Sequence, residues 1–396
     1  MDSEKTESAP AGEVPQYTLV ATPDGFQRIL EALVPASRAA FDIEADSLYH
    51  YFEKICLIQI STDQETFVLD PLAVRDLSGF APIMDDPAVE KVFHAASYDI
   101  LCLRRDYRFS IKNLFDTHLA ALLLGYEQLG LDALLERLLG IAHSKRRQRD
   151  DWSRRPLVPE QLEYAAMDTH HLLQLRDLLE AQLEEKGRLS WAQEEFRALA
   201  GLETAEREFD PEGFRHIKGS RELTLQQLAV VRALYLLRDR YAREMDVPPF
   251  KVVNNSVLLD LARRPPQSAR EMFRRSGISF RVARRFGGEI FRTIEKARSE
   301  DPASLVLPAR SANKAPPREA KARLELLRVW RRAKAEQLQL HVGVVFPGNL
   351  LEALALFPPA DLDALQAVAG MRNWRVREFG EEILKVLRKK IVTHDA

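Results

Sequence analysis

The second half of the chain repeats itself at a constant offset of 93 residues, which is the feature that most restricts its fold. The matched pairs include Leu234 and Leu327, Arg238 and Arg331, Leu258 and Leu351, Pro265 and Pro358, Gly277 and Gly370, and Phe286 and Phe379. No gap is needed over this span, and chance similarity does not hold register for so long. We therefore predict two copies of one small module.

Both copies show helical spacing of apolar residues and no strand pattern, so we expect two small all-α domains. We place the first at 210–300 and the second at 318–396. Between them, residues 301–317 are rich in Pro, Ala and Ser, which is typical of a linker. Residues 1–15 are polar and have neither the basic nor the apolar region of a signal peptide, so we predict a disordered tail.

Residues 16–205 alternate strand-like and helix-like segments. Three closely spaced strands, 38–45, 54–61 and 65–70, predict an antiparallel meander, and 89–94 is a fourth short strand. Helices are expected at 98–106, 117–125 and 132–139, and one long amphipathic helix at 159–184. The result is an α/β domain, a mixed sheet flanked by helices.

Asp42 and Glu44 lie two residues apart on the predicted strand FDIEA. Strand alternation places both carboxylates on one face and their apolar neighbours on the other. Two acids on one face of a largely buried strand repel each other unless a cation lies between them. Taken alone, the pair also fits an edge strand with a solvated acidic face.

Two further acids follow. Asp99 lies just after a predicted strand and at a helix start, where it could equally be a first-turn acid that complements the helix dipole. Tyr164 and Asp168 are four residues apart on a predicted helix and share a face. That pair alone also fits an ordinary polar helix surface.

Together, these elements predict a metal-dependent phosphodiesterase. Mg²⁺ and Mn²⁺ prefer oxygen ligands, and phosphodiester hydrolysis uses two such ions about 3.5–4 Å apart. Asp42, Glu44, Asp99 and Asp168 could supply the ligands, and the Tyr164 hydroxyl could orient the attacking water.

In these segments the chain resembles ribonuclease D, of the tyrosine-containing branch of the DEDD exonuclease superfamily. The resemblance is carried by FDIEADS, KICLIQIST, VFHAASYDI, FDTHLAALLLG and DDWSRRPLVPEQLEYAAMDTHHLL. The repeated module resembles the HRDC domain through PPFKVVNNSVLLDLARRPP and SGISFRVARRFGGEIFRTI. The second copy is more divergent, with Trp374 where the first has Arg281.

The resemblance implies a ribonuclease H-like exonuclease domain followed by two HRDC-like domains. It also implies a 3′→5′ exoribonuclease that trims single-stranded RNA 3′ ends, such as those of tRNA precursors, and releases nucleoside 5′-monophosphates. Two divalent ions, Mg²⁺ or Mn²⁺, would be bound by Asp42, Glu44, Asp99 and Asp168, and Tyr164 would position water. The alternatives are a single-stranded DNA 3′→5′ exonuclease and a non-catalytic nucleic-acid-binding scaffold.

The net charge of −2 conceals an asymmetry that favours a polyanionic partner. Residues 1–206 hold 21 basic and 36 acidic side chains, whereas residues 207–300 hold 20 basic and 12 acidic. An acidic half suits metal ions and a basic half suits a nucleic acid. The candidate nucleic-acid contacts are His94, Arg146, Arg147, Arg263, Arg264, Arg284 and Arg285.

Cys56 and Cys102 both lie in apolar runs, which is typical of buried thiols in a reducing compartment. No apolar run approaches the length of about 20 residues that a membrane helix needs. We therefore expect a cytoplasmic protein with no membrane partner, acting as a monomer.

Overall fold

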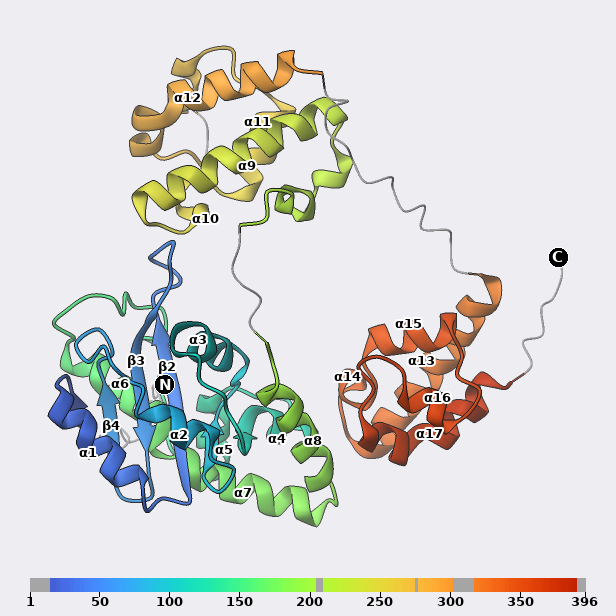
Figure 1. The fold of residues 1–396 in the computed structure, drawn as a ribbon. Helices are drawn as coiled ribbons and strands as arrows, with labels where there is room; N and C mark the ends of the chain where they lie inside the picture. Colours follow the sequence, from blue (N-terminus) through green and yellow to red (C-terminus); the bar gives the residue numbers. More distant parts are fainter. Residues whose placement is uncertain (1–14, 204–208, 275–276, 302–316, 390–396) are drawn as a thin grey trace, which may run out of the picture. The chain divides into compact units, whose positions relative to one another are not determined.

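The computed structural model describes residues 15–203, 209–274, 277–301 and 317–389. The predicted tail and nearly all of the predicted linker lie outside these ranges. Figure 1 shows the helices and strands of the chain, coloured along the sequence from blue to red. The chain divides into two compact units. One contains residues 1–44, 55–204 and 313–396, and the other contains residues 45–54 and 205–312. The turn between the first two long strands therefore belongs to the unit that holds the first helical module.

A six-stranded mixed sheet forms the centre of the α/β domain. Its strands are β1 (Thr18–Val20), β2 (Arg38–Ala45), β3 (Ile55–Ser61), β4 (Thr66–Leu69), β5 (Glu90–Phe93) and β6 (Leu114–Asp116), in the order β1-β4-β3-β2-β5-β6. β3 pairs antiparallel with β4, as the predicted meander requires, whereas β1–β4, β2–β5 and β5–β6 are parallel. β3 is buried along its whole length, so it lies between two covered faces.

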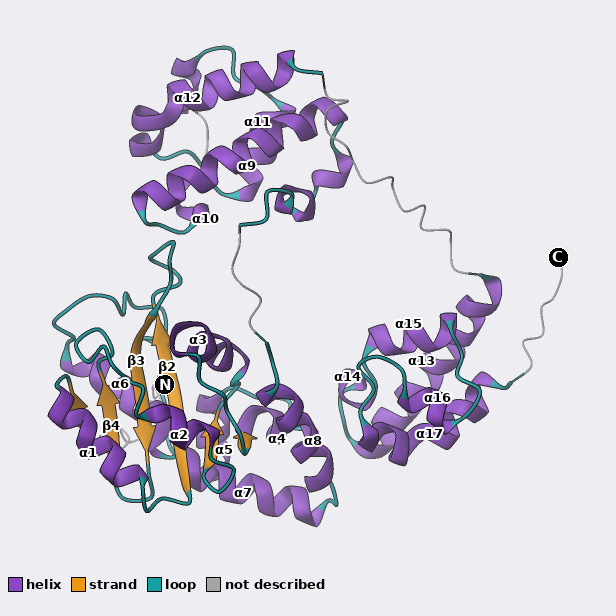
Figure 2. Cartoon of the chain, in the orientation of Figure 1, coloured by secondary structure: helices purple, strands orange, loops and turns teal. Residues whose placement is uncertain are grey.

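Helices cover both faces of this sheet (Figure 2). One face packs on α1 (Pro23–Leu33), α2 (Phe80–Asp85) and α3 (Ser97–Tyr107). The other face packs on α4 (Thr117–Leu124), α5 (Leu131–Leu139), α6 (Pro159–His170), α7 (Leu172–Glu185) and α8 (Leu189–Ala200). The domain is thus a three-layer α/β sandwich, as predicted.

Several details differ from the prediction. The expected single helix at 159–184 is two helices, because His171 leaves helical geometry at φ −103° and ψ 6°. The periodicity of the apolar residues continues across this break, which is why the sequence pattern did not reveal it. Strands β1 and β6 and helices α1, α2 and α8 were not predicted. The two strands have three residues each, which is too short to show alternation.

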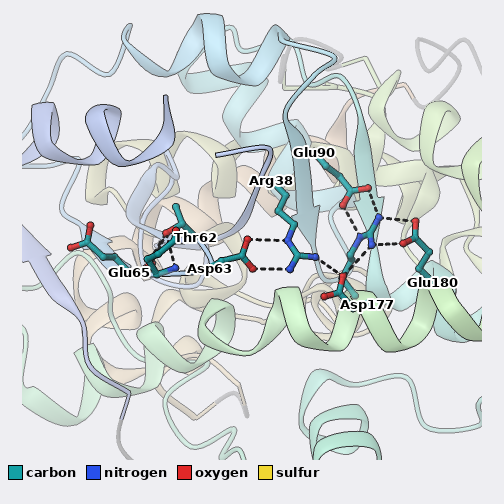
Figure 3. Close-up of polar contacts among 9 residues, drawn as sticks. Arg38, Thr62, Asp63, Glu65, Glu90, Asp177 and Glu180 are labelled. Carbon is teal, nitrogen blue, oxygen red and sulfur yellow. Dashed lines mark hydrogen bonds and ion pairs between the residues drawn. The ribbon is translucent and has the colours of Figure 1, made fainter. Parts of the chain in front are cut away.

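An ion-pair network ties α7 to the sheet (Figure 3). Arg38, the first residue of β2, donates to both carboxylate oxygens of Asp63 at 3.1 and 2.7 Å and also pairs with Asp177 of α7. Arg176 of α7 donates to the two oxygens of Glu90 on β5 at 2.7 and 3.0 Å. Isolated exposed pairs contribute little, but two bidentate arginines in one network fix geometry. Since α7 follows α6 directly, this network also limits how α6 can move.

The first helical module contains α9 (Leu225–Met245), α10 (Pro249–Val252), α11 (Asn255–Arg263) and α12 (Phe280–Ser299), with three short 3₁₀ turns at Gly213–His216, Ser220–Glu222 and Ala269–Arg274. Residues 45–54 pack on α9. His50 Nδ1 lies 2.6 Å from Asp246 Oδ2, and the Tyr51 hydroxyl donates to Asp239. Residues 45–54 are therefore packed with this module.

The second module reproduces the first at the same offset. It consists of α13 (Arg318–Leu338), α14 (Val342–Val345), α15 (Gly348–Leu356), α16 (Leu362–Gln366) and α17 (Asn373–Leu387). α13, α14 and α15 begin and end 93 residues after α9, α10 and α11. The repeat inferred from the sequence is therefore a structural repeat.

Trp374 explains why the second copy diverges. Its side chain is fully buried and stacks on Trp191 of α8, with ring centroids 4.5 Å apart and an interplanar angle of 14°. Arg375 donates to Glu195 of the same helix at 2.7 Å. The face that is basic in the first copy is in the second copy part of the core shared with the α/β domain. No helix in the described ranges is both long and apolar enough to cross a bilayer.

Candidate active site

The alternation of β2 brings Asp42 and Glu44 to the face covered by α6 and α7. Phe41 and Ile43 pack into the core on the opposite face, whereas Ala40 packs on the α6–α7 side. Asp42 and Glu44 point the same way as Ala40 because side chains two apart share a face. Asp168 of α6 meets them there, and the three residues offer carboxylate oxygens that all lie within 4.8 Å of one another.

Asp99 is the fourth predicted acid, and it is 7% exposed in the first turn of α3. It is close enough to Asp42 and Asp168 for their charges to act on one another. The turn before α3 is tight, since Ala95 has a φ of +60°, an uncommon value for a residue with a Cβ. Asp116 stabilises this turn by accepting from the Ala96 amide at 2.7 Å, and its other oxygen caps α4 by accepting from the Leu119 amide at 2.8 Å. The positive φ of Ala95 costs free energy, and the hydrogen bond to Ala96 maintains it in the turn that presents Asp99.

Helix α6 contributes Tyr164 together with Asp168. The Tyr164 ring stacks on Trp152 at 6.0 Å between centroids and on His143 at 5.4 Å. His143 Nε2 in turn lies 2.8 Å from Asp168 Oδ1, with both side chains nearly buried. The His143 ring therefore contacts both the Tyr164 ring and the Asp168 carboxylate, which share a face of α6.

Burial and mutual repulsion raise the carboxyl pKa values of this cluster. The pKa values of Asp42 and Glu44 lie well above their ordinary range, first because of burial and then because of Asp168 and Asp99. Burial and the carboxyls of Asp116 and Asp168 do the same to the pKa of Asp99. The pKa of the Tyr164 hydroxyl is also raised, by burial and by these acids, so the phenol stays protonated at neutral pH.

A divalent cation would relieve this repulsion. The donor set is made of carboxylate oxygens, which suits Mg²⁺ or Mn²⁺, and nothing in it favours a soft metal. Asp42, Glu44 and Asp168 lie close enough together to share an ion. The described residues therefore fit the predicted metal chemistry.

Three residues of the α/β domain are predicted to contact nucleic acid, and two of them bond to other side chains of the protein instead. His94 Nδ1 lies 2.9 Å from the Thr117 hydroxyl, and burial lowers the pKa of His94 to about 3. The ring is therefore neutral at pH 7 and has no charge to offer a phosphate. Arg147 pairs with Asp150 at 3.2 Å, whereas Arg146 is exposed on the loop that precedes α6.

Of the four arginines of the first module that are predicted to contact nucleic acid, three form ion pairs within the module. Arg263 pairs with Glu222 at 3.0 Å, and Arg264 and Arg285 pair with Asp260 and Glu244. Arg284 lies exposed on α12, one turn from Phe280. Nucleic-acid contact by these residues stays a prediction.

Sequence reasoning missed His143, Asp116 and Trp152 because each acts through the tertiary fold. His143 is 25 residues from Asp168, in a loop with no periodicity. Asp116 is the last residue of a three-residue strand and resembles an ordinary helix N-cap, which it also is. Local spacing carries no signal for such contacts.

The comparisons with known proteins identify an exonuclease domain and two HRDC domains in this chain. A 3′-5′ exonuclease family model matches residues 17–184, and an HRDC domain model matches residues 227–294 and 320–387. Ribonuclease D of Gluconacetobacter diazotrophicus is 32% identical over 93% of this chain and 92% of its own length. The chain belongs to the ribonuclease D family. The ribonuclease D of Pseudomonas paraeruginosa is also 32% identical, over 88% of this chain and 91% of its own length.

Solved structures of ribonuclease D-like enzymes share the fold. Escherichia coli RNase D, described as an exoribonuclease involved in structured RNA processing, matches with a TM-score of 0.70 and 25% identity over 94% of this chain and 99% of that chain. The catalytic core of RRP6 from Trypanosoma brucei matches with a TM-score of 0.64 and 31% identity, over 71% of this chain and 79% of that chain. The predicted family and fold class are confirmed, and the chain is a hydrolase of the 3′→5′ exoribonuclease type.

Proposed function

We propose that this ribonuclease D family member hydrolyses the 3′ ends of single-stranded RNA, and that Asp42, Glu44, Asp99 and Asp168 hold two divalent cations, Mg²⁺ or Mn²⁺. The observation that carries the proposal is that carboxylates of β2 and α6 lie within 4.8 Å of one another, with Asp99 of α3 close enough for its charge to act on Asp42. Two such ions, when bound, would activate a water molecule and stabilise the leaving oxygen.

The side chains around the carboxylates have separable roles in this proposal. The protonated Tyr164 hydroxyl can orient the attacking water by a hydrogen bond, since the raised pKa keeps its proton in place. Trp152, only 1% exposed, limits the movement of the Tyr164 ring by stacking on it. The Asp116 carboxylate maintains the turn that presents Asp99.

The partner is RNA with a free 3′ end, and tRNA precursors are the substrate class proposed from the sequence. The alternatives are a preference for single-stranded DNA and a scaffold without catalysis. Family membership, the cluster of Asp42, Glu44 and Asp168, and the presence of Asp99 and Tyr164 beside it favour an active ribonuclease. Both free cysteines are buried, which fits the proposed cytoplasmic location, and the monomeric state stays a prediction.

We expect RNA labelled at its 5′ end to shorten stepwise, and only when Mg²⁺ or Mn²⁺ is present. RNA labelled at its 3′ end should lose the label in the first step, as a mononucleotide. Matched DNA strands and EDTA controls run beside each reaction. Faster degradation of DNA than of RNA would establish the DNA alternative, and binding of both strands without cleavage would establish the scaffold.

The exposed face of α12 is the most suitable RNA-binding surface in the first module. Phe280 is 71% exposed, and Phe273 is 47% exposed with its ring centroid 5.7 Å from that of Phe280. Arg281 and Arg284 are exposed beside Phe280 on the same helix. Exposed aromatic rings beside arginines can stack bases while the cations contact phosphates. In the second copy, Trp374 stands in place of Arg281 and is buried, so that copy lacks this surface.

Replacing Phe280 by Ala should weaken binding of single-stranded RNA by about 5- to 100-fold, the loss typical of one base–aromatic stack. The double variant Arg281→Gln/Arg284→Gln should also flatten the salt dependence of binding, by about 0.7 in log–log slope for each lost phosphate contact. The measurement is fluorescence anisotropy with 5′-labelled RNA in EDTA. Arg377→Gln, at the position of the second copy that corresponds to Arg284, is the matched control. Equal affinity of all four proteins would move the RNA surface elsewhere.

A further inference from the structure

His143 contacts two proposed active-site residues at once. Its Nε2 lies 2.8 Å from Asp168 Oδ1, and its ring lies nearly parallel to that of Tyr164, at 20° and 5.4 Å between centroids. The His143 side chain is 5% exposed and that of Asp168 11%, so water competes little for the hydrogen bond. A nearly buried carboxylate gains more from such a bond than an exposed one.

The two contacts constrain different degrees of freedom. A hydrogen bond to one oxygen of Asp168 fixes the rotation of the carboxylate about its last bond, and so the direction in which its lone pairs point. The ring stack restricts the tilt of Tyr164, and so the position of its hydroxyl. Hydrogen bonds to ligating carboxylates are known to orient them for the metal. His143 makes both contacts.

The loop that carries His143 is held in place by several contacts of the residues that follow the histidine. Lys145 pairs with Asp132 of α5 at 2.6 Å. Further along, Asp150 accepts from Gln161 of α6 at 3.0 Å, and Arg155 donates to both oxygens of Asp70 at 2.6 and 2.8 Å. His143 therefore has a defined position that does not depend on its two contacts alone. A ring held in this way can position its neighbours.

We infer that His143 is a positioning residue for the hydrolysis, which orients the Asp168 carboxylate for a divalent cation and the Tyr164 hydroxyl for the attacking water. The inference rests on the proposed function and deepens it, since it assigns a role to a residue outside the four carboxylates and the tyrosine. His143 itself contacts neither the cation nor the RNA in this account.

The test compares His143→Ala, His143→Gln and the unmodified full-length protein. With Ala, kcat on single-stranded RNA should fall by about 10- to 100-fold with KM nearly unchanged, and Mn²⁺ affinity should fall by a similar factor. Mn²⁺ affinity is measured by electron paramagnetic resonance without RNA. Gln keeps an N–H donor but no ring, so it should recover Mn²⁺ affinity more fully than kcat.

The matched control is His170→Ala, on the helix that carries Tyr164 and Asp168; His170 is exposed, and its Nδ1 lies 2.9 Å from the Thr66 hydroxyl. It should leave both measurements unchanged. Wild-type kcat and Mn²⁺ affinity in His143→Ala would overturn the inference, as would an equal loss of Mn²⁺ affinity in the Ala and Gln variants with unchanged thermal unfolding. If the unmodified protein binds Mn²⁺ but does not cleave RNA, the proposed function fails, and the Mn²⁺ titration still decides whether His143 orients Asp168.

Discussion

Replacing Asp42 by Asn will lower the rate of RNA degradation by about 10³-fold or more while leaving RNA affinity in place. Asn has nearly the same shape, but its amide supplies one neutral oxygen where the site needs a charged one. The measurement is single-turnover cleavage of 5′-labelled RNA in Mg²⁺, with binding measured in EDTA. Asp85→Asn, an exposed carboxyl paired with Lys112, is the matched control and should retain full activity. An Asp42→Asn protein that stays active would exclude Asp42 from the metal site.

The same substitution should stabilise the metal-free protein. Asp42, Glu44 and Asp99 have folded-state pKa values above their ordinary ones, because of burial and mutual repulsion. In the window between the ordinary and the raised pKa, the folded chain holds protons that the unfolded chain has lost. Stability therefore falls as pH rises through this window, from about pH 4 upward.

In EDTA, Asp42→Asn should unfold at a higher temperature than the unmodified protein, because one of the repelling charges is gone. The difference should grow from about pH 5 to about pH 8. Adding Mn²⁺ should raise the unfolding temperature of the unmodified protein more than that of the variant, since only a protein that binds the ion gains from it. If the difference in unfolding temperature between the two proteins does not change with pH, the carboxylates do not repel one another as described.

Replacing Tyr164 by Phe should lower kcat by about 10²-fold with KM nearly unchanged. The substitution removes only the hydroxyl and keeps the ring that stacks on His143 and Trp152. The packing of α6 is thus preserved, and a loss of rate reports the hydroxyl's role in orienting water. Steady-state cleavage of RNA measures both constants. Tyr126→Phe, which loses a hydrogen bond to Gln182, is the matched control.

A fully active Tyr164→Phe protein would remove the hydroxyl from the mechanism. In that case the ring would serve only as a packing surface between His143 and Trp152, and the orientation of the water would depend on the cations and carboxylates alone. A loss of RNA affinity without a loss of kcat would instead place the hydroxyl in substrate binding.

The sequence alone determined the features that depend on local order. The alternation of β2 placed Asp42 and Glu44 on one face, and the helical spacing placed Tyr164 with Asp168. The 93-residue offset defined the two modules, down to the bounds of α13, α14 and α15. In each case the information lies in residues a few positions apart or in a direct comparison of two segments.

Only the tertiary structure decided how these segments meet. It brought Asp168 to Asp42 across 126 positions and placed His143 against Asp168 and Tyr164. It showed that Arg263 and Arg285 are paired with acids, and that Trp374 is buried against Trp191. Such contacts join residues far apart in the chain, and a single sequence does not encode a distant partner in its local pattern. The chemistry of the site was therefore readable from the residue types, whereas its geometry required the fold.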